Sequence, residues 1–225
     1  MLECEDAIEA AGVESGFCVI LCDIGNSRAH LYERGNVVDL SIDECFERYG
    51  KKRVHYICVN DRVKRDIPKK APKWIDVSRF RMLETSYKGL GIDREAACLG
   101  VEDGIVVDAG SAITVDLMEN GVHKGGWIWP GISAMKSAYA KISSRLDCEI
   151  VTDLDFGNLP QDTCSAVSFG VLAPIETLVE RFGEGKRVIV TGGDAEKIAS
   201  ILPGAQVDKE VVFKGMKKMI KENEC

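Results

Sequence analysis

The residues best suited to bind a charged ligand lie in two short segments of similar sequence. The first reads Asp-Ile-Gly-Asn-Ser over 23–27, and the second reads Asp-Ala-Gly-Ser over 108–111. In each, an apolar stretch ends at an aspartate and a glycine opens a turn, which brings a carboxylate and free backbone N–H groups to one point. A metal-bound phosphate is recognised by that combination. One such turn would be an ordinary hairpin end. Two in equivalent places favour a site for a nucleotide triphosphate, with hydrogen bonds from Asn26, Ser27 and Ser111.

A third segment, 188–195, ends an apolar stretch with two glycines and an aspartate. Glycine lets the backbone approach a ligand closely, and Asp194 is placed to cap the helix expected after it. The chain has no G-x-x-x-x-G-K-[ST] sequence, and Gly89 and Gly91 are not followed by the third glycine of a dinucleotide fold. A nucleotide would therefore be bound in another way.

The elements expected around the first segment are a strand, a hairpin, a helix and a strand. The apolar run over 17–25 predicts a strand, and alternation over 28–40 around a Gly-Asn turn at 35–36 predicts a hairpin. The range 41–50 predicts a helix, because its first residues fit a capping box, and 53–60 returns to strand composition.

The same order begins again later in the chain. The range 104–129 reads as a strand, an aspartate, a glycine, a second strand, an Asn-Gly turn and a third strand. Aligning Asp23 with Asp108 gives a period of 108 − 23 = 85 residues, which indicates a duplicated domain.

Because strands alternate with helices, the predicted fold class is α/β. Further expected elements are a short helix with an exposed connection over 61–74, helices over 131–146, 162–182, 194–202 and 210–221, and a strand over 187–193.

Composition narrows the kind of partner. The 225 residues carry 29 Lys and Arg against 36 Asp and Glu, so the net charge of −7 disfavours non-specific binding to nucleic acid or to an anionic membrane. The longest apolar run, 17–22, is far shorter than the ~20 residues of a membrane span. The first sixteen residues hold five acidic and no basic side chains, unlike a secretory leader. Nine cysteines without a C-x-x-C pair fit a reducing cytoplasm. We therefore expect a small-molecule partner.

Several other polar or aromatic residues have a structural interpretation. Cys18 and Cys22 share one face of a strand, but His30 is their only nearby potential ligand, so they are expected in the core instead of at a metal. Asp93 and Arg94, taken alone, would form a surface ion pair. We expect His30, His55 and His123 to have structural roles. Asp103 is expected in a loop and Asp116 on the face of a sheet, while Trp127 and Trp129 are expected in the core or at a subunit interface.

Five ordered motifs together carry a resemblance to a known family. They are DIGNS at 23–27, GLGIDR at 89–94, DAGSAIT at 108–114, GGWIWPGI at 125–132 and TGGDA at 191–195. In order and spacing they resemble the type III pantothenate kinases, from Phe17 to the last helix. These kinases belong to the superfamily of acetate and sugar kinases, chaperone ATPases and actin, which places two ribonuclease-H-like domains around ATP.

The resemblance implies a domain division and an activity. It implies an N-terminal extension over 1–16, a first actin-like domain over 17–101 and a second over 102–225, whose last helix is free to pack back on the first. The implied reaction is the ATP-dependent phosphorylation of pantothenate, the first step of coenzyme A biosynthesis, by a cytoplasmic homodimer. A regulatory ATP-binding protein that uses the fold as a clamp, and a kinase of another small alcohol, remain as alternatives.

The resemblance also implies roles for individual residues. Asp93 is the implied proton acceptor, Asp23 holds magnesium through water, and Asp108 is the ligand of a monovalent cation, potassium or ammonium. The implied contacts to ATP are Asp23, Ile24, Gly25, Asn26, Ser27, Ser111, Gly192 and Gly193, and those to pantothenate are Tyr87, Gly91, Ile92, Asp93, Arg94 and Thr163. The sequence departs from the family in having serine for threonine at 27 and 111, and a shorter loop between Tyr87 and Gly91.

Overall fold

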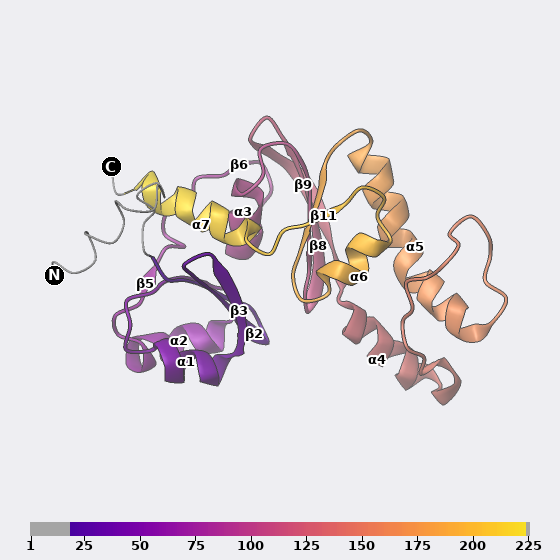
Figure 1. Ribbon diagram of the computed structural model, residues 1–225, viewed down its shortest axis with the longest axis horizontal. Coiled ribbons are helices and arrows are strands. Elements are labelled where there is room, and N and C mark those ends of the chain that lie inside the picture. The colour runs from indigo at the N-terminus through magenta and orange to yellow at the C-terminus, as the bar shows by residue number, and fades with distance from the viewer. Residues whose placement is uncertain (1–18, 224–225) are drawn as a thin grey trace, which may run out of the picture.

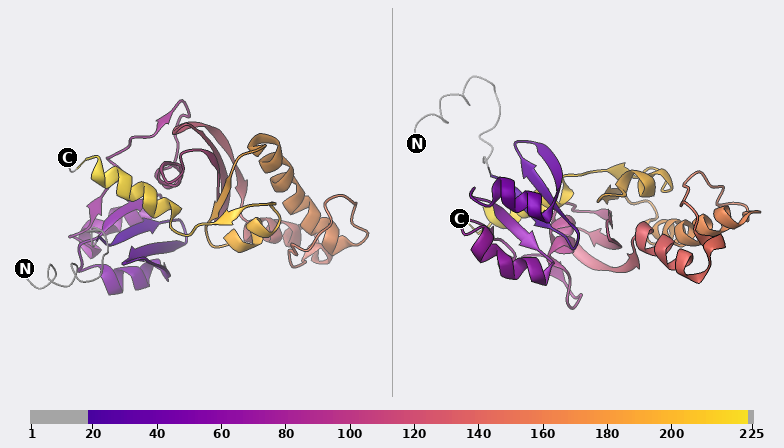
Figure 2. Two further views of the ribbon diagram at one scale, coloured as in Figure 1. Left: turned by 45° about the horizontal axis from the view of Figure 1, so that its top comes forward. Right: turned by 90° about the horizontal axis from the view of Figure 1, so that it is seen from below.

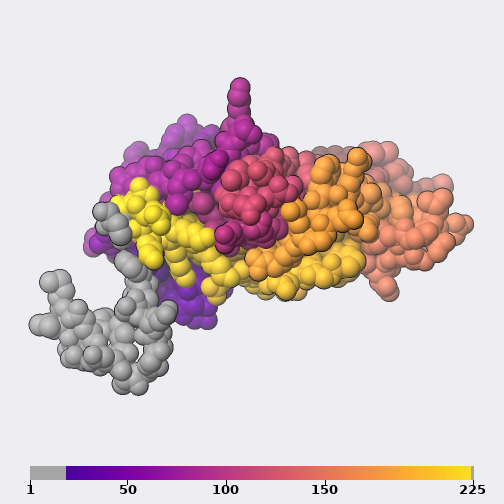
Figure 3. All heavy atoms as spheres, turned by 90° about the horizontal axis from the view of Figure 1, so that it is seen from above, coloured from indigo at the N-terminus to yellow at the C-terminus, as the bar shows by residue number. Residues whose placement is uncertain are grey.

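The computed structural model describes residues 19–223, and the molecule is elongated (Figure 3). The extension over 1–16 and Cys18 lie outside the described residues. The elements of the first half are β1 (Leu21–Ile24), β2 (Arg28–Glu33), β3 (Asn36–Ser41), α1 (Ile42–Tyr49), β4 (His55–Cys58), α2 (Asp61–Lys70), β5 (Ile75–Asp76), β6 (Glu84–Thr85) and α3 (Ile92–Leu99). The second half holds β7 (Gly104–Ala109), β8 (Ala112–Glu119), β9 (Val122–Pro130), α4 (Ile132–Ile142), the 3₁₀ turn η1 (Ser144–Leu146), α5 (Thr163–Gly183), β10 (Val188–Thr191), α6 (Ala195–Ser200), β11 (Gln206–Val207) and α7 (Val211–Lys221).

The two sheets repeat one topology, which confirms the predicted duplication. The first sheet has the strand order β3-β2-β1-β4-β5, and the second has β11-β10-β7-β8-β9-β6. In the first, β1 pairs antiparallel with β2 and parallel with β4. In the second, β7 pairs antiparallel with β8 and parallel with β10 in the same way. Only β6, a two-residue edge strand on β9, has no counterpart in the first sheet.

Local sequence explains most of these elements. Helix α1 begins at Ser41, whose hydroxyl accepts from the Glu44 backbone N–H while Glu44 accepts from the Ser41 backbone N–H, a complete capping box. The first hairpin turns at Arg34 and Gly35, with φ of 52° and 81°, one residue earlier than predicted. The second turns at Asn120 and Gly121 as predicted.

Helices α3 and α7 lie between the two sheets and join them (Figures 1 and 2). One apolar cluster contains Leu21 and Ile57 of the first sheet, Val106 of the second, and side chains of both helices, among them Ala96 and Met216. On the outer faces, α1 and α2 cover the first sheet, whereas α4, α5 and α6 belong to the cluster on the far side of the second. The last helix therefore packs against α3 and β1, while the division of the chain at 101 stays a prediction.

Helix α5 is the one described helix that is long and apolar enough, by length and composition, to cross a membrane. In this fold it instead buries Val171, Leu172 and Ile175 in the cluster on the second sheet, as the core helix of a globular domain does. Its N-terminal turn is joined to the segment before it by a Cys148–Cys164 disulfide. The sequence predicted no disulfide.

Candidate active site

The two motif-bearing hairpin turns meet face to face at the mouth of a cleft between the sheets. Asp23 and Asp108 lie near the ends of β1 and β7, and each strand is followed by a glycine whose N–H closes the turn, Gly25 to the Arg28 carbonyl and Gly110 to the Ala112 carbonyl. The first turn is one residue longer than the second. The Oγ atoms of Ser27 and Ser111 lie 3.0 Å apart, which brings the two phosphate-binding segments predicted from sequence to one place.

A cavity of about 770 Å³ extends from this contact. It is large enough for a nucleotide. Its walls come from both halves of the chain and include most of the polar residues predicted from sequence: Asp23, Gly25, Asn26, Ser27, Asp93, Asp108, Gly110, Ser111, Thr191, Gly192, Gly193 and Asp194. Ile24 and Ile92 are instead buried side chains of the core, so any contact to a ligand would come from their backbone.

Three of the carboxylates that line the cavity, Asp23, Asp93 and Asp108, have raised pKa values. Burial and the charges of Asp93 and Asp108 hold the pKa of Asp23 well above its usual value. Burial and the charges of Asp93 and Asp116 raise the pKa of Asp108 to about 7, and burial raises that of Asp93. The Oδ1 atom of Asp23 is buried and has no hydrogen-bond partner within residues 19–223. An orphaned carboxylate oxygen beside two further acids fits a site for cations.

The Thr191–Asp194 turn closes the cavity on the side of the second sheet. Gly192 has a φ of 93°, and a Cβ there would lie 2.5 Å from Asp108 Oδ1, so this position requires glycine. A Cβ at Gly193 would meet nothing within 4 Å, which leaves that backbone open to a ligand. Asp194 does not cap α6 through its side chain, contrary to the sequence prediction, because its carboxylate instead pairs with Lys197 at 3.2 Å.

Asp93 and Arg94 begin helix α3 and point to different partners. Asp93 lies on the cavity wall, where its Oδ1 accepts the Arg94 backbone N–H at 2.8 Å. The Arg94 side chain is 5% exposed and forms a bidentate ion pair with Asp116, with distances of 2.9 Å from Nε and 2.7 Å from Nη2. The surface ion pair that Asp93 and Arg94 suggest when taken alone is therefore replaced by a buried ion pair between Arg94 and Asp116.

Two of the predicted pantothenate contacts have different surroundings. Tyr87 lies near Arg94, whose guanidinium is 4.9 Å from the centre of the tyrosine ring, and lines a second cavity of about 470 Å³. Thr163 is exposed at the start of α5 and lines neither cavity. The structure thus brings Asp93 together with most of the predicted ATP residues, whereas Gly91, Ile92, Arg94 and Thr163 line neither cavity.

Sequence reasoning missed three residues near the site. Asp116, His123 and Thr85 were expected to be structural or were not singled out, yet they form a buried polar network beside Arg94 and Tyr87. A faint signal was available, since an aspartate inside the apolar run of β8 is expensive to bury without a partner.

The remaining expectations held for Trp127 and Trp129, which pack on the core of the second sheet, and for Cys22, which lies beside Cys45 in the core of the first.

The fold and the cleft define a class, the actin-like fold with paired domains around a nucleotide site. Two solved structures share this fold at low sequence identity. One is an activator of 2-hydroxyisocaproyl-CoA dehydratase from Clostridium difficile with bound ADPNP, at a TM-score of 0.53 and 13% identity, covering 92% of this chain and 97% of that one. The other is a protein described as a 2-dehydro-3-deoxygalactonokinase from Sinorhizobium meliloti, at a TM-score of 0.50 and 10% identity, covering 91% and 99%.

Closer relatives identify the family within this class. The type III pantothenate kinase family model matches residues 61–184. Type III pantothenate kinases from Campylobacter jejuni (strain RM1221) and Wolinella succinogenes are 43% and 42% identical over 91% of this chain, covering 98% and 97% of their own lengths. The chain belongs to the type III pantothenate kinases, which phosphorylate pantothenate in the first step of coenzyme A biosynthesis. Its substrates are pantothenate and ATP.

One solved structure is similar over nearly the whole chain. It comes from Campylobacter jejuni, has a TM-score of 0.81 and 41% identity, and covers 92% of this chain and 99% of its own. That protein is described as a transcriptional activator of the Baf family. The agreement in fold over 92% of this chain supports the arrangement of the two halves described above.

Proposed function

We propose that Asp93 is the general base that accepts the hydroxyl proton of pantothenate as the alcohol attacks the γ-phosphorus of ATP. The observation that carries this assignment is the position of Asp93 on the wall of the nucleotide cavity with no side-chain ion pair to Arg94. Burial raises its pKa, which makes the carboxylate a better proton acceptor. In a loose transition state the proton leaves late, so a modest base that is accurately placed suffices.

The ATP phosphates are proposed to bind between the two hairpin turns. Backbone N–H groups near Gly25 and Gly110, with the hydroxyls of Ser27 and Ser111, would hold the phosphate oxygens, while Gly192 and Gly193 would lie beside the adenosine. Asp23 would hold magnesium through water, and its orphaned Oδ1 supports that role. The bound cation would neutralise charge on the transferred phosphoryl group.

Asp108 is proposed as the ligand of a monovalent cation, potassium or ammonium. Its pKa of about 7 reflects burial beside two other acids, and a cation at that point would stabilise the ionised carboxylate. A large, weakly hydrated ion gives up its water to a buried carboxylate more readily than a second divalent ion, which demands more oxygen ligands.

The assembly and location are proposed as a homodimer in the cytoplasm. Exposed apolar side chains at Ile128, Ile142 and Phe182 support a subunit contact on the second half of the chain. Such a contact would also give a role to Thr163, which lines neither cavity of its own chain. In a reducing cytoplasm Cys148 and Cys164 would be thiols.

Turnover across a panel of alcohols tests the substrate assignment. Purified protein is incubated with ATP and, in turn, pantothenate, pantetheine, glycerol and a hexose, and the phosphorylated product is identified by mass spectrometry. We expect product with pantothenate at a specificity at least tenfold above the other alcohols. ATP binding with no transfer to any alcohol would favour the clamp alternative, and preference for another alcohol would overturn the substrate.

A further inference from the structure

A closed circuit of hydrogen bonds joins Tyr87 and Arg94, two of the predicted pantothenate contacts. The Tyr87 backbone N–H donates to the Thr85 hydroxyl at 3.0 Å, and that hydroxyl lies 2.7 Å from His123 Nδ1. His123 Nε2 lies 2.8 Å from Asp116 Oδ1, Asp116 binds Arg94, and Arg94 Nη1 returns to the Tyr87 hydroxyl at 3.4 Å. Five residues from four separate elements and one loop thus form a ring.

The hydrogen-bond partners of His123 indicate which of its ring nitrogens carries a proton. The Asp116 carboxylate only accepts hydrogen bonds, so His123 must carry its proton on Nε2. In neutral His123 the Nδ1 atom is then an acceptor, and the Thr85 hydroxyl donates to it while accepting from Tyr87. Each donor in the ring therefore faces an acceptor. The ring is also buried at its centre, since Asp116 and His123 are each 2% exposed. Satisfied buried networks of this kind hold their members rigidly.

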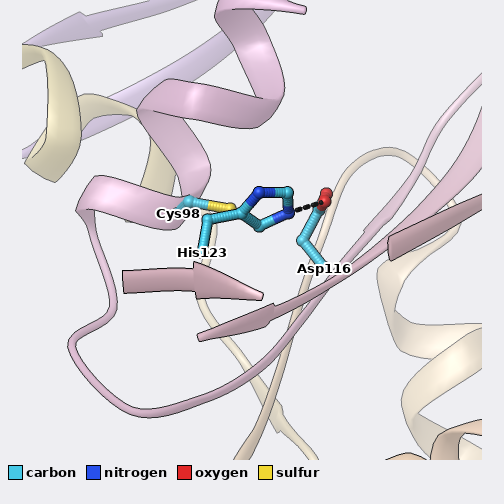
Figure 4. Close-up of side chains that lie close together, drawn as sticks. All are labelled: Cys98, Asp116 and His123. Atoms are coloured by element: carbon cyan, nitrogen blue, oxygen red, sulfur yellow. Dashed lines mark hydrogen bonds and ion pairs between the residues drawn. The ribbon is translucent and has the colours of Figure 1, made fainter. Parts of the chain in front are cut away.

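A metal ion is the other interpretation of this cluster. Ligand atoms of Cys98, Asp116 and His123 lie within 4.8 Å of one another (Figure 4). Both oxygens of Asp116 and both ring nitrogens of His123 already have partners, however, and the Arg94 guanidinium supplies the positive charge. Burial raises the pKa of the Cys98 thiol and keeps it protonated. The observations favour a guanidinium site over a metal site.

The ring lies where it controls two features of the proposed reaction. Strand β6 has two residues, and the Thr85–His123 contact is the side-chain bond that ties it to β9. Tyr87, which lines the second cavity, is therefore held in place through Thr85. On the other side, Asp116 holds Arg94 away from Asp93. The space around this ion pair is tight, because a Cβ on Gly126 would lie 2.6 Å from Asp116 Oδ1 and 3.0 Å from Arg94 Nη2.

We propose that Thr85, His123 and Asp116 are positioning residues for pantothenate. They hold Tyr87 on the wall of the second cavity and keep the Arg94 guanidinium on Asp116, so that Asp93 is free for the hydroxyl of the alcohol. The inference rests on the proposed roles of Asp93 and Tyr87. None of the three residues lines the nucleotide cavity. Removal of the Thr85 or His123 side chain, which carries no charge interaction with Asp23, Asp93 or Asp108, is therefore expected to affect pantothenate and leave ATP binding unchanged.

Thr85→Val is the main test, because it removes one hydroxyl at nearly constant volume from a half-buried site and leaves the Arg94–Asp116 pair intact. We expect the KM for pantothenate to rise about 3–10-fold, the range that one lost hydrogen bond produces, with the KM for ATP unchanged. Thr85→Ser, which keeps the hydroxyl, is expected to stay within about twofold of the wild type. Thr177→Val, on the exposed face of α5, is the control for loss of a threonine hydroxyl.

His123→Gln and Asp116→Asn extend the series. Glutamine at 123 can still donate to Asp116 but loses the acceptor for Thr85, so its effect should match that of Thr85→Val. Asp116→Asn leaves a buried guanidinium without its anion and is expected to lower kcat/KM for pantothenate by about 100-fold. If that variant does not fold, the Thr85 pair still decides the question.

Nitrogen-15 NMR of the wild-type protein supplies a readout that does not depend on turnover. We expect His123 to show an unprotonated Nδ1 and a protonated Nε2. The inference is overturned by a wild-type pantothenate KM in Thr85→Val, by an equal rise in the ATP KM, or by Thr85→Ser resembling Thr85→Val. It is also overturned by the opposite tautomer, or by a stoichiometric metal ion that the wild-type protein holds and His123→Gln loses. The general-base role of Asp93 is tested separately, by the kcat of Asp93→Asn. Its failure can therefore be distinguished from failure of the positioning role proposed for Thr85, His123 and Asp116.

Discussion

At the scale of single residues, the neighbours Asp93 and Arg94 show how a helix start separates two charges. Both lie in the first turn of α3, yet the carboxylate lines the nucleotide cavity and the guanidinium pairs with the buried Asp116 of β8. The sequence could place both residues in the substrate segment. It could not identify Asp116 as the partner of Arg94, because that contact spans 22 residues and depends on how α3 packs on β8.

Asp23→Asn is expected to weaken the use of magnesium-ATP without loss of stability. The pKa of Asp23 is raised by burial and by Asp93 and Asp108, which means that its ionised form is disfavoured in the folded protein. The amide removes that repulsion at nearly the same volume. We expect the KM for magnesium-ATP to rise at least tenfold and the melting temperature of the metal-free protein to stay equal or rise. A defect confined to the pantothenate KM, or a lower melting temperature, would contradict this role.

Activity is expected to depend on a monovalent cation through Asp108. Rates measured at constant ionic strength should be higher in potassium or ammonium than in sodium, because the larger ions lose their water more readily at a single buried carboxylate. Asp108→Asn should abolish the difference between the salts. Equal wild-type rates in sodium and potassium would remove this role from Asp108.

At the scale of elements, the site depends on the close contact of α3 with α7. A Cβ on Gly215 of α7 would lie 1.8 Å from the Ala96 carbonyl oxygen of α3, and one on Gly100 would lie 2.3 Å from the Val211 carbonyl oxygen. Both contacts are to backbone, which cannot rotate away. The two glycines therefore set the distance between the helix that carries Asp93 and the last helix of the chain.

Gly215→Ala is expected to lower the free energy of unfolding by about 1–3 kcal/mol, the typical cost of forcing extra volume into a packed interior. The cost exceeds the gain of up to about 1 kcal/mol from better helix propensity. Urea denaturation of the variant beside Lys218→Ala, an exposed change on the same helix, measures the difference. A Gly215→Ala variant as stable as the control would show that the helices can separate freely.

Most elements could be predicted from the sequence because their signals are local. Three examples are the capping box of α1, the Asn120–Gly121 turn and the helical periodicity of α5. In each, the residues that carry the signal are near neighbours along the chain. Strands β5, β6 and β11 were not predicted, since each has two residues and exists only through its pairing with a distant strand. For the same reason the sequence did not reveal the role of Thr85.

At the scale of the whole molecule, the duplicated topology explains why two aspartates 85 residues apart meet at one cleft. Each half ends its central strand with an aspartate and a glycine turn, and the helices between the sheets bring the two turns together at Ser27 and Ser111. The period could be read from the sequence. The contact between the turns could not, because it depends on the angle at which α3 and α7 hold the two sheets.

The protein is expected to be a homodimer in solution. Light scattering at micromolar concentration should give twice the 24.7 kDa mass of one chain. Ile128→Asp on the exposed face of β9 should shift the mass toward the monomer, because it places a charge on an apolar surface that a partner would bury. A wild-type mass near 24.7 kDa would overturn the dimer and leave Thr163 without a role in the site.

The turnover of Asp93→Asn tests the central claim most directly. Asparagine keeps the shape and removes the proton acceptor, so we expect kcat for pantothenate phosphorylation to fall about 10²–10⁴-fold. The dissociation constant for ATP, measured by calorimetry on the same preparation, should change little. Asp153→Asn, a change of an exposed acid outside the cavity, should behave as the wild type. Near-normal turnover of Asp93→Asn would show that this carboxylate is not the base.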